Sequence, residues 1–282
     1  MPRGPALPLR QPSISDPHDS LSAADEAAAF PLAWALVPAL LLAGLVLLVH
    51  LSGSNTPLFI TLNAAGGSLP SALWATITLG GSVLGALALL APTLKTRPRW
   101  LASAFLASPL AMLFSQGGKQ YFDIMRPAGV LEAESFNLIG QKLYVHAFPS
   151  GHATTVFVLA AALILAWPRA ATRWRAAVGI LGLAGLVAFS RIAVGAHWPL
   201  DVLAGAAGGW TAGAIGVWLS IRLPAFSEPR GVRVMATIVL ATSLALLFVD
   251  IGQPEAHLYR IGLAAWGIGG AAAALMNDPE RS

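Results

Sequence analysis

Long apolar runs alternate with short polar stretches along the chain from about residue 32 onwards. A helix that crosses a bilayer needs about 20 mostly apolar residues, and several of these runs reach that length once flanking polar residues are included. The pattern predicts eight spanning helices, at Leu32 to Leu51, Ala72 to Leu94, Trp100 to Gly117, Ala153 to Trp167, Ala176 to Phe189, Pro199 to Ile221, Val234 to Val249 and Ile261 to Met276. We therefore expect an all-α fold, a polytopic membrane helix bundle.

The composition agrees with that expectation. Hydrophobic residues make up 56% of the chain and charged residues 11%, against about 25% charged residues in an ordinary soluble domain. The chain has no cysteine, which excludes disulfides and thiolate metal sites. Its net charge of +4 is small and lies between apolar runs, so we expect membrane lipids and no nucleic acid as partners.

The segments outside the predicted spans have two characters. Residues 1–30 are rich in Pro, Ser, Ala and acidic residues and lack the apolar core of a signal peptide, which predicts a disordered tail. The stretch TPLFITLNAAGG, residues 56–67, is too short to cross a membrane. It is typical of a brief helix that lies at the membrane interface.

Basic residues set the expected orientation. They occupy three short connections between predicted spans, as Lys95, Arg97 and Arg99, then Arg169, Arg173 and Arg175, then Arg222, Arg230 and Arg233. With eight spans these connections share one side, and the positive-inside rule makes that side the cytoplasm. Both termini are then cytoplasmic, in a multi-pass protein of what the composition suggests is a bacterial inner membrane. The opposite, periplasmic side receives loop 118–151, segment 190–199 and loop 250–260.

Three polar clusters fall on that outer side, each at the end of a span. They are KQYFDIMRP with Lys119, Arg126 and Pro127, then Pro149-Ser150-Gly151-His152, then SRIAVGAHWPLD with Ser190, Arg191, His197 and Asp201. Taken singly, a basic residue at a span end can simply reach the headgroups, and a serine before an apolar run can simply cap a helix. His197 and Asp201 are four residues apart, on one helical face, where a structural pair is the plain alternative to a catalytic one.

Together the clusters indicate an anion site. A helix N-terminus offers free backbone N–H groups and a partial positive charge. Lys119, Arg126 and Arg191 add further donors, and the arginine fork matches phosphate oxygens. The ligand that this combination implies is a phosphoryl group.

The order K-x6-RP, PSGH, SR-x5-H-x3-D resembles the three-block signature of the type-2 phosphatidic acid phosphatase family, the membrane lipid phosphate phosphatases. Soluble relatives occur among vanadium haloperoxidases and bacterial acid phosphatases. The signature runs from Lys119 to Asp201. The resemblance implies a six-span phosphatase core with the active site in residues 31–223, followed by two additional transmembrane helices in residues 224–282.

The resemblance also implies a role for each signature residue. His197 is the nucleophile that forms a phosphohistidine, Asp201 holds its tautomer, and His152 is the general acid and later the base. The phosphate oxygens are expected to bind Lys119, Arg126, Ser150, Gly151 and Arg191. No metal or cofactor is expected, because the outer loops lack the clustered carboxylates of a magnesium or calcium site.

The expected activity is hydrolysis of a phosphate or pyrophosphate from a lipid. Family substrates include undecaprenyl pyrophosphate, phosphatidylglycerol phosphate, phosphatidic acid and lipid A phosphates, and the sequence does not choose among them. Two alternatives stay open here. A phosphotransferase on the same scaffold would pass the phosphoryl group to another lipid, and a transport or structural protein would only bind an anion.

Overall fold

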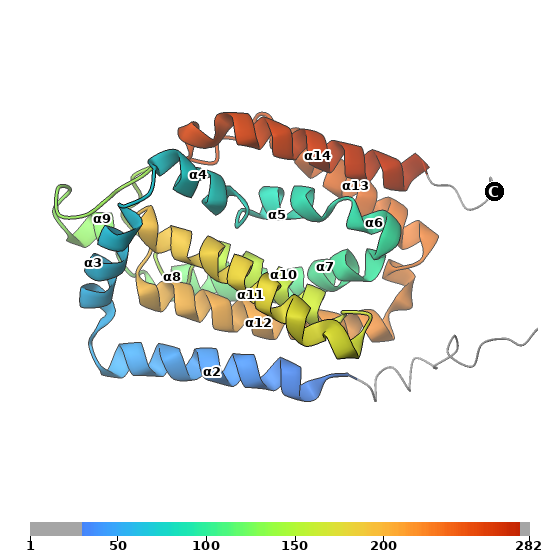
Figure 1. Ribbon diagram of the computed structural model, residues 1–282, viewed down its shortest axis with the longest axis horizontal. Coiled ribbons are helices and arrows are strands. Elements are labelled where there is room, and N and C mark those ends of the chain that lie inside the picture. The colour runs from blue at the N-terminus through green and yellow to red at the C-terminus, as the bar shows by residue number, and fades with distance from the viewer. Residues whose placement is uncertain (1–29, 277–282) are drawn as a thin grey trace, which may run out of the picture.

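The computed structural model describes residues 30–276, and all regular secondary-structure elements in that range are helices (Figure 1). The predicted disordered tail, apart from Phe30, lies outside the described residues. The elements are α2 (Leu32–Leu51), α3 (Asn55–Gly66), α4 (Ser71–Leu79), α5 (Val83–Leu90), α6 (Thr93–Thr96), α7 (Pro98–Met112), the π-helical turn η1 (Leu113–Gly117), α8 (Gly118–Phe122), α9 (Pro127–Val130), α10 (Gly151–Leu165), α11 (Ala170–Ala193), α12 (Pro199–Arg222), η2 (Pro224–Phe226), α13 (Pro229–Ala245), η3 (Pro254–Ala256) and α14 (His257–Met276).

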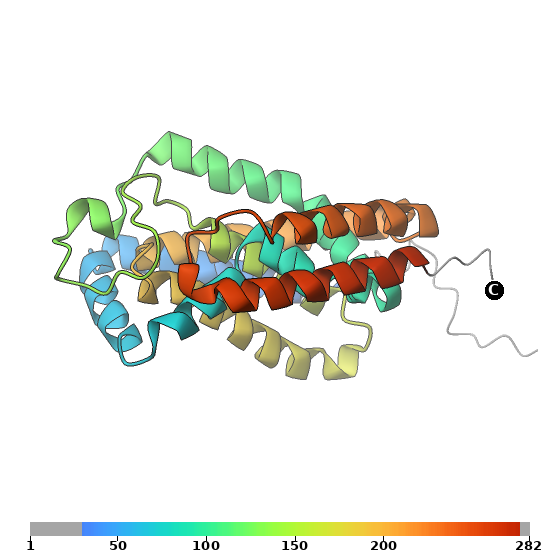
Figure 2. The ribbon, with the colours of Figure 1, turned by 90° about the horizontal axis from the view of Figure 1, so that it is seen from above.

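The long helices lie side by side in one bundle and run back and forth along its length (Figures 1 and 2). Five helical segments of the described residues are long and apolar enough to cross a membrane, or six if α4 and α5 count as one bent span. Helices α10 and α13 have 15 and 17 residues and fall short of that length. The predicted all-α membrane bundle is confirmed, whereas the count of eight crossings stays a prediction.

The predicted span at residues 72–94 differs in shape from a single helix. It consists of α4 and α5, which meet at an angle of 71°. The break falls at Gly80 and Gly81, where the missing side chains remove the usual support for a continuous helix. Ser82 then starts α5, because its Oγ accepts the backbone N–H of Gly85 at 3.0 Å.

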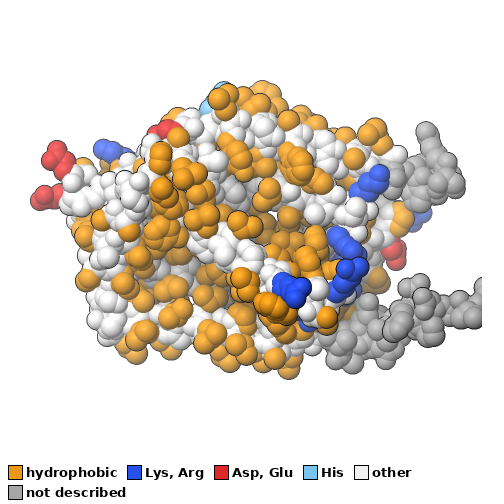
Figure 3. Space-filling view, in the orientation of Figure 1, with side chains coloured by type: hydrophobic (Ala, Val, Ile, Leu, Met, Phe, Trp, Pro, Cys, Tyr) orange, Lys and Arg blue, Asp and Glu red, His pale blue; other side chains and the backbone are white. Residues whose placement is uncertain are grey.

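The outer surface of the bundle is that of a membrane protein. Helix α2 turns mostly leucine outward, with Leu40 and Leu41 exposed by 68% and 65%, and apolar side chains cover much of the face in Figure 3. Most Lys and Arg side chains visible there gather at the end of the bundle where α6 lies. The opposite end carries α3, α9 and the long loop between α9 and α10 (Figure 1).

Small residues bring α10 and α12 into close contact. A Cβ on Gly205 would lie 2.5 Å from the carbonyl oxygen of Ser150, and one on Gly213 would lie 2.7 Å from that of Val158. Gly209 meets the backbone of Thr154 in the same way. Since only glycine permits two helix backbones to approach so closely, this ridge aligns the two helices and places their N-termini together.

Helix α3 fixes the site end of the bundle. The buried Asn63 amide donates to the carbonyl oxygens of Asn137 and Ile192, each at 2.9 Å, and its oxygen accepts the Asn137 backbone N–H at 2.7 Å. The long outer loop and the end of α11 are therefore held to the same side chain.

Candidate active site

The site is built on two adjacent helix starts. Ser150 begins α10, where its Oγ accepts the backbone N–H of Ala153 at 3.5 Å, and its own N–H donates to the carbonyl oxygen of Asp201 at 3.0 Å. Asp201 lies in the first turn of α12 and accepts the backbone N–H of Trp198 at 2.8 Å. The free N–H groups of both helices, with their partial positive charge, therefore lie at one place.

Hydrogen bonds on both sides of His197 determine its tautomer. Arg126 Nη1 lies 3.2 Å from Nε2, and Asp201 Oδ2 lies 3.4 Å from Nδ1. A guanidinium can only donate, and an ionised carboxylate can only accept. Nε2 therefore carries the lone pair and Nδ1 the proton, which is the form of imidazole that can attack an electrophile through Nε2.

Arg126 is held by backbone carbonyls of the long outer loop and of the α11–α12 connection, and not by a counter-ion. Its Nε donates to the Val145 carbonyl at 2.9 Å, Nη1 to that of Ala196 at 2.9 Å, and Nη2 to that of His146 at 3.3 Å. With the bond to His197, four of the five guanidinium N–H groups are already used. These carbonyls thus fix the positive charge beside the imidazole.

Arg191 is held differently. It is 5% exposed, and its Nη1 donates to the hydroxyl of Thr78, on α4, at 2.6 Å. Its Nε is buried without a partner among the described residues. Most of this guanidinium is therefore available to an added anion.

Lys119 and His152 complete the cluster. The Lys119 ammonium lies 3.6 Å from the position of a Cβ on Gly151, at the start of α10. His152 follows directly, and no group among the described residues hydrogen-bonds its ring. Burial, followed by the charges of Arg126, Arg191, Lys119 and His152, lowers the pKa of His197 well below its usual 6.5.

All the sequence-predicted site residues therefore lie in one cluster, at the end of the bundle expected to face outward. Three segments contribute them: α8 to α9, the start of α10, and the end of α11 with the start of α12. This arrangement can bind a dianion between two imidazoles and three cations. Their catalytic roles stay predictions.

Sequence reasoning missed the supporting residues. Thr78 and Gly81 come from the α4–α5 break, and Asn63 and Asn137 join α3 to the outer loop. The Gly-Gly pair at residues 80–81 was the one available signal, because such a pair inside an apolar run marks a break. Single polar residues such as Thr78 and Asn63 carry no pattern of their own.

An apolar groove of about 680 Å³ opens between α5, α7 with η1, and α10. Five polar side chains also line it, from Ser108, Ser115, Gln116, Thr154 and Thr155. Thr155 is three residues after His152, and Gln116 is three residues before Lys119, so each lies one helical turn from a site residue. Two residues of the groove lining therefore lie close in the chain to the cluster, although no residue of the cluster itself lines the groove.

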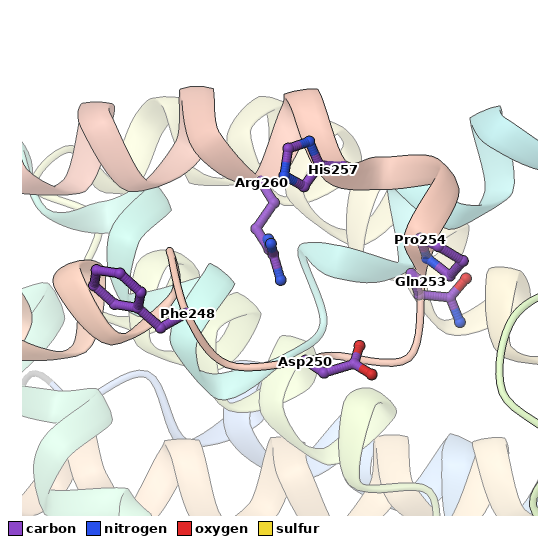
Figure 4. A pocket seen from close by; sticks show the side chains of 6 residues that line it. All are labelled: Phe248, Asp250, Gln253, Pro254, His257 and Arg260. Carbon is purple, nitrogen blue, oxygen red and sulfur yellow. The ribbon is translucent and has the colours of Figure 1, made fainter.

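A second, smaller cavity of about 380 Å³ lies at the loop between α13 and α14 (Figure 4). Its lining residues are Phe248, Asp250, Gln253, Pro254, His257 and Arg260. None of the predicted site residues lines it. In the described part of the chain no group of three or more His, Asp or Glu side chains is placed to hold a metal ion.

The chain is similar in sequence to a known protein family and to several characterised proteins. Residues 98–224 match the PAP2 superfamily. The chain is 35% identical over 102 residues to the undecaprenyl-diphosphatase of Sulfolobus acidocaldarius, covering 36% of this chain and 41% of that protein. It is 26% identical over 166 residues to the lipid A 1-phosphatase of Porphyromonas gingivalis, covering 59% of this chain and 34% of that protein. The chain thus spans less than half the length of these curated relatives.

A solved structure is also similar. The crystal structure of Aquifex aeolicus LpxE superposes with a TM-score of 0.51 at 28% sequence identity. The superposition covers 93% of that chain and 57% of this one. The other residues of this chain lie outside the superposed part.

Proposed function

On the premise that the chain belongs, through residues 98–224, to the PAP2 superfamily, we propose that it is an integral membrane phosphatase. Its substrate is a lipid that carries a terminal phosphate or diphosphate, of the kind named in its relatives. One observation carries the proposal: His197 is held with Nε2 unprotonated beside Arg126, with Asp201 behind it.

The reaction follows from that arrangement in two steps. The Nε2 lone pair of His197 attacks phosphorus, the bond from phosphorus to the ester oxygen breaks, and the leaving oxygen takes a proton from His152. In the second step His152 removes a proton from water, the water oxygen attacks phosphorus, and the P–N bond breaks to release inorganic phosphate. Each transition state spreads negative charge over the equatorial oxygens, so fixed positive charge supplies much of the catalysis.

The two arginines divide this work. Arg191 has most of its N–H groups free for phosphate oxygens, whereas Arg126 already uses four bonds, one of them to His197. An arriving phosphate oxygen replaces His197 as the acceptor for Arg126, which frees the lone pair that attacks. With Lys119 and the backbone N–H of Gly151, the protein supplies the positive charge itself, and we propose that no metal ion takes part.

The groove between α5, α7 and α10 supports a lipid as the substrate. Its volume of about 680 Å³ lies in the usual range of ligand pockets, about 300–1,000 Å³. Its walls are mostly apolar, and two of its polar residues, Gln116 and Thr155, lie three positions from Lys119 and His152 along the chain. The lipid tail occupies the groove while the phosphate enters the cationic cluster.

The proposed topology has eight crossings, with α10 and α13 as short spans, and it leaves both termini in the cytoplasm. The basic end of the bundle (Figure 3) is then cytoplasmic, in a bacterial inner membrane. The site faces the periplasm. Residues 31–223 form the phosphatase core, and residues 224–282 contribute the two additional helices.

The direct test is hydrolysis by the purified protein in detergent, with EDTA present and a panel of lipid phosphates and diphosphates as substrates. We expect inorganic phosphate to be released from at least one lipid. Transfer of label to an acceptor lipid without free phosphate would indicate the phosphotransferase instead. Binding without turnover would leave only an anion-binding protein and would contradict the proposal.

The pH dependence of kcat/KM is a second expectation. His197 must be neutral to attack, and its pKa in the folded protein is lowered below 6.5. Protonation therefore removes activity only as the pH falls below that range, so activity persists into mildly acidic solution. On the alkaline side, activity falls when the general acid, His152, loses its proton. A bell-shaped profile whose acid limb lies above pH 6.5 would contradict this account of His197.

Filling the groove tests the lipid assignment. Ala111→Trp, which adds an indole to the groove wall, is expected to lower kcat/KM for a long-chain lipid phosphate by about tenfold, or ~1.4 kcal/mol. Hydrolysis of a water-soluble aryl phosphate should stay within about twofold, because that substrate has no tail. The matched control is Leu40→Trp on the exposed face of α2. Equal losses on both substrates would show that the groove does not hold the tail.

A further inference from the structure

The α4–α5 break touches the proposed site, although it lies before residues 98–224, the part matched to the family. Thr78 and Leu79, the last residues of α4, are buried with 0% and 1% of their surface exposed. The 71° bend that follows turns the chain away at Gly80 and Gly81. The end of α4 is thereby packed against α11 and not continued past it.

Thr78 is the tether of Arg191. The distance of 2.6 Å between Nη1 and the threonine Oγ1 is that of a short hydrogen bond. Among the described residues no other group bonds this guanidinium. Because both side chains are buried, the bond forms away from water and fixes the rotation of the guanidinium plane.

The comparison with Arg126 shows why one tether matters. Arg126 is held by backbone carbonyls on three of its nitrogen atoms, so loss of any one leaves its position determined. Arg191 has one bond, and its Nε is buried and unpartnered. With Nη1 taken by Thr78, the Nε–Nη2 edge is the pair of donors left to grip two oxygens of one phosphate.

The same break also borders His152. A Cβ on Gly81 would lie 3.0 Å from both Cβ and Cδ2 of His152, and 2.9 Å from Cγ1 of Val187. Only a glycine leaves room for the imidazole here. The break thus adjoins two predicted site residues, one through a hydrogen bond and the other through packing.

We propose that Thr78 is a positioning residue, which orients Arg191 so that its free edge receives the phosphate oxygens. This inference rests on the proposed phosphatase function. It adds a residue from α4 to a site whose signature lies wholly in residues 119–201.

The test compares Thr78→Val, which keeps the shape and removes the acceptor, with Thr78→Ser, which keeps the hydroxyl. Thr78→Val is expected to raise KM and the inhibition constant of inorganic phosphate by about tenfold or more, since a buried charged donor loses its partner. Thr78→Ser should stay within about threefold of the unchanged protein. Thr211→Ala, an exposed threonine on α12, is the matched control.

An unchanged inhibition constant of inorganic phosphate for Thr78→Val would overturn the proposal. So would an equally large defect in Thr78→Ser, which keeps the hydroxyl. The unfolding temperature in detergent separates a folding defect from a positioning defect. If the unchanged protein hydrolyses no lipid phosphate, the proposed function fails, and calorimetric binding of inorganic phosphate still decides the role of Thr78. Weaker phosphate binding by Thr78→Val would support it there, while equal binding, or no binding by either protein, would refute it.

Discussion

Replacing His197 with alanine is expected to abolish lipid phosphate hydrolysis, with a loss in kcat on the order of 10⁴-fold or more. The nucleophilic Nε2 disappears, and water alone must attack a phosphate that is held in place but not activated. Arg126 loses only one of its four bonds, so the phosphate-binding cluster keeps its frame. The measurement is the release of inorganic phosphate under single-turnover conditions.

His50→Ala is the matched control, because His50 is an exposed histidine at the end of α2. It should hydrolyse at the rate of the unchanged protein. Both variants should unfold within a few degrees of it. If the His197→Ala protein still hydrolysed lipid phosphate at a tenth of the normal rate, the covalent mechanism would be contradicted.

Replacing Asp201 with asparagine is expected to reduce kcat by about 10³-fold with little change in KM. The Trp198 N–H and Nδ1 of His197 both meet the same carboxylate oxygen, Oδ2, so an asparagine oxygen placed there keeps both contacts and the cap of α12. The negative charge behind the imidazole is lost, however. The imidazole ring becomes positively charged when Nε2 attacks phosphorus, and a neutral amide stabilises that charge far less than a carboxylate does.

Asp250→Asn, at an exposed turn where the carboxylate accepts the Gly252 N–H, is the control and should leave activity unchanged. The pH profile separates the two roles of Asp201. If Asp201 were only structural, its substitution would lower the amount of folded protein, and the pH profile of the protein that still folds would be unchanged. Activity of Asp201→Asn within about threefold of normal would contradict this role of the carboxylate charge.

The helix pattern was predictable because each predicted span produces its own signal of about 20 apolar residues. The Gly80–Gly81 pair marked where the second span could break, but not the direction of the bend, which depends on the packing of α4 against α11 and of α5 against α13 and α14. Helix α10 shows a related limit. Its 15 residues are short for a span, and it holds its place because the glycine ridge of α12 lies against it.

The site was predictable where residue type and spacing carry the chemistry, as in the pair His197 and Asp201. The partners of those residues were not. Arg126 is fixed by the carbonyls of Val145 and Ala196, and a backbone group leaves no mark in a sequence. Thr78 meets Arg191 across 113 positions of the chain, a separation at which no local rule applies.

The most direct measurement is to trap phosphate on the protein itself. The protein is mixed with a lipid labelled in its terminal phosphate, quenched in alkali within milliseconds, and mapped by peptide mass. We predict label on His197, stable in alkali and lost in acid, and none after His197→Ala. Rapid hydrolysis with no label on His197 at any time would contradict the account.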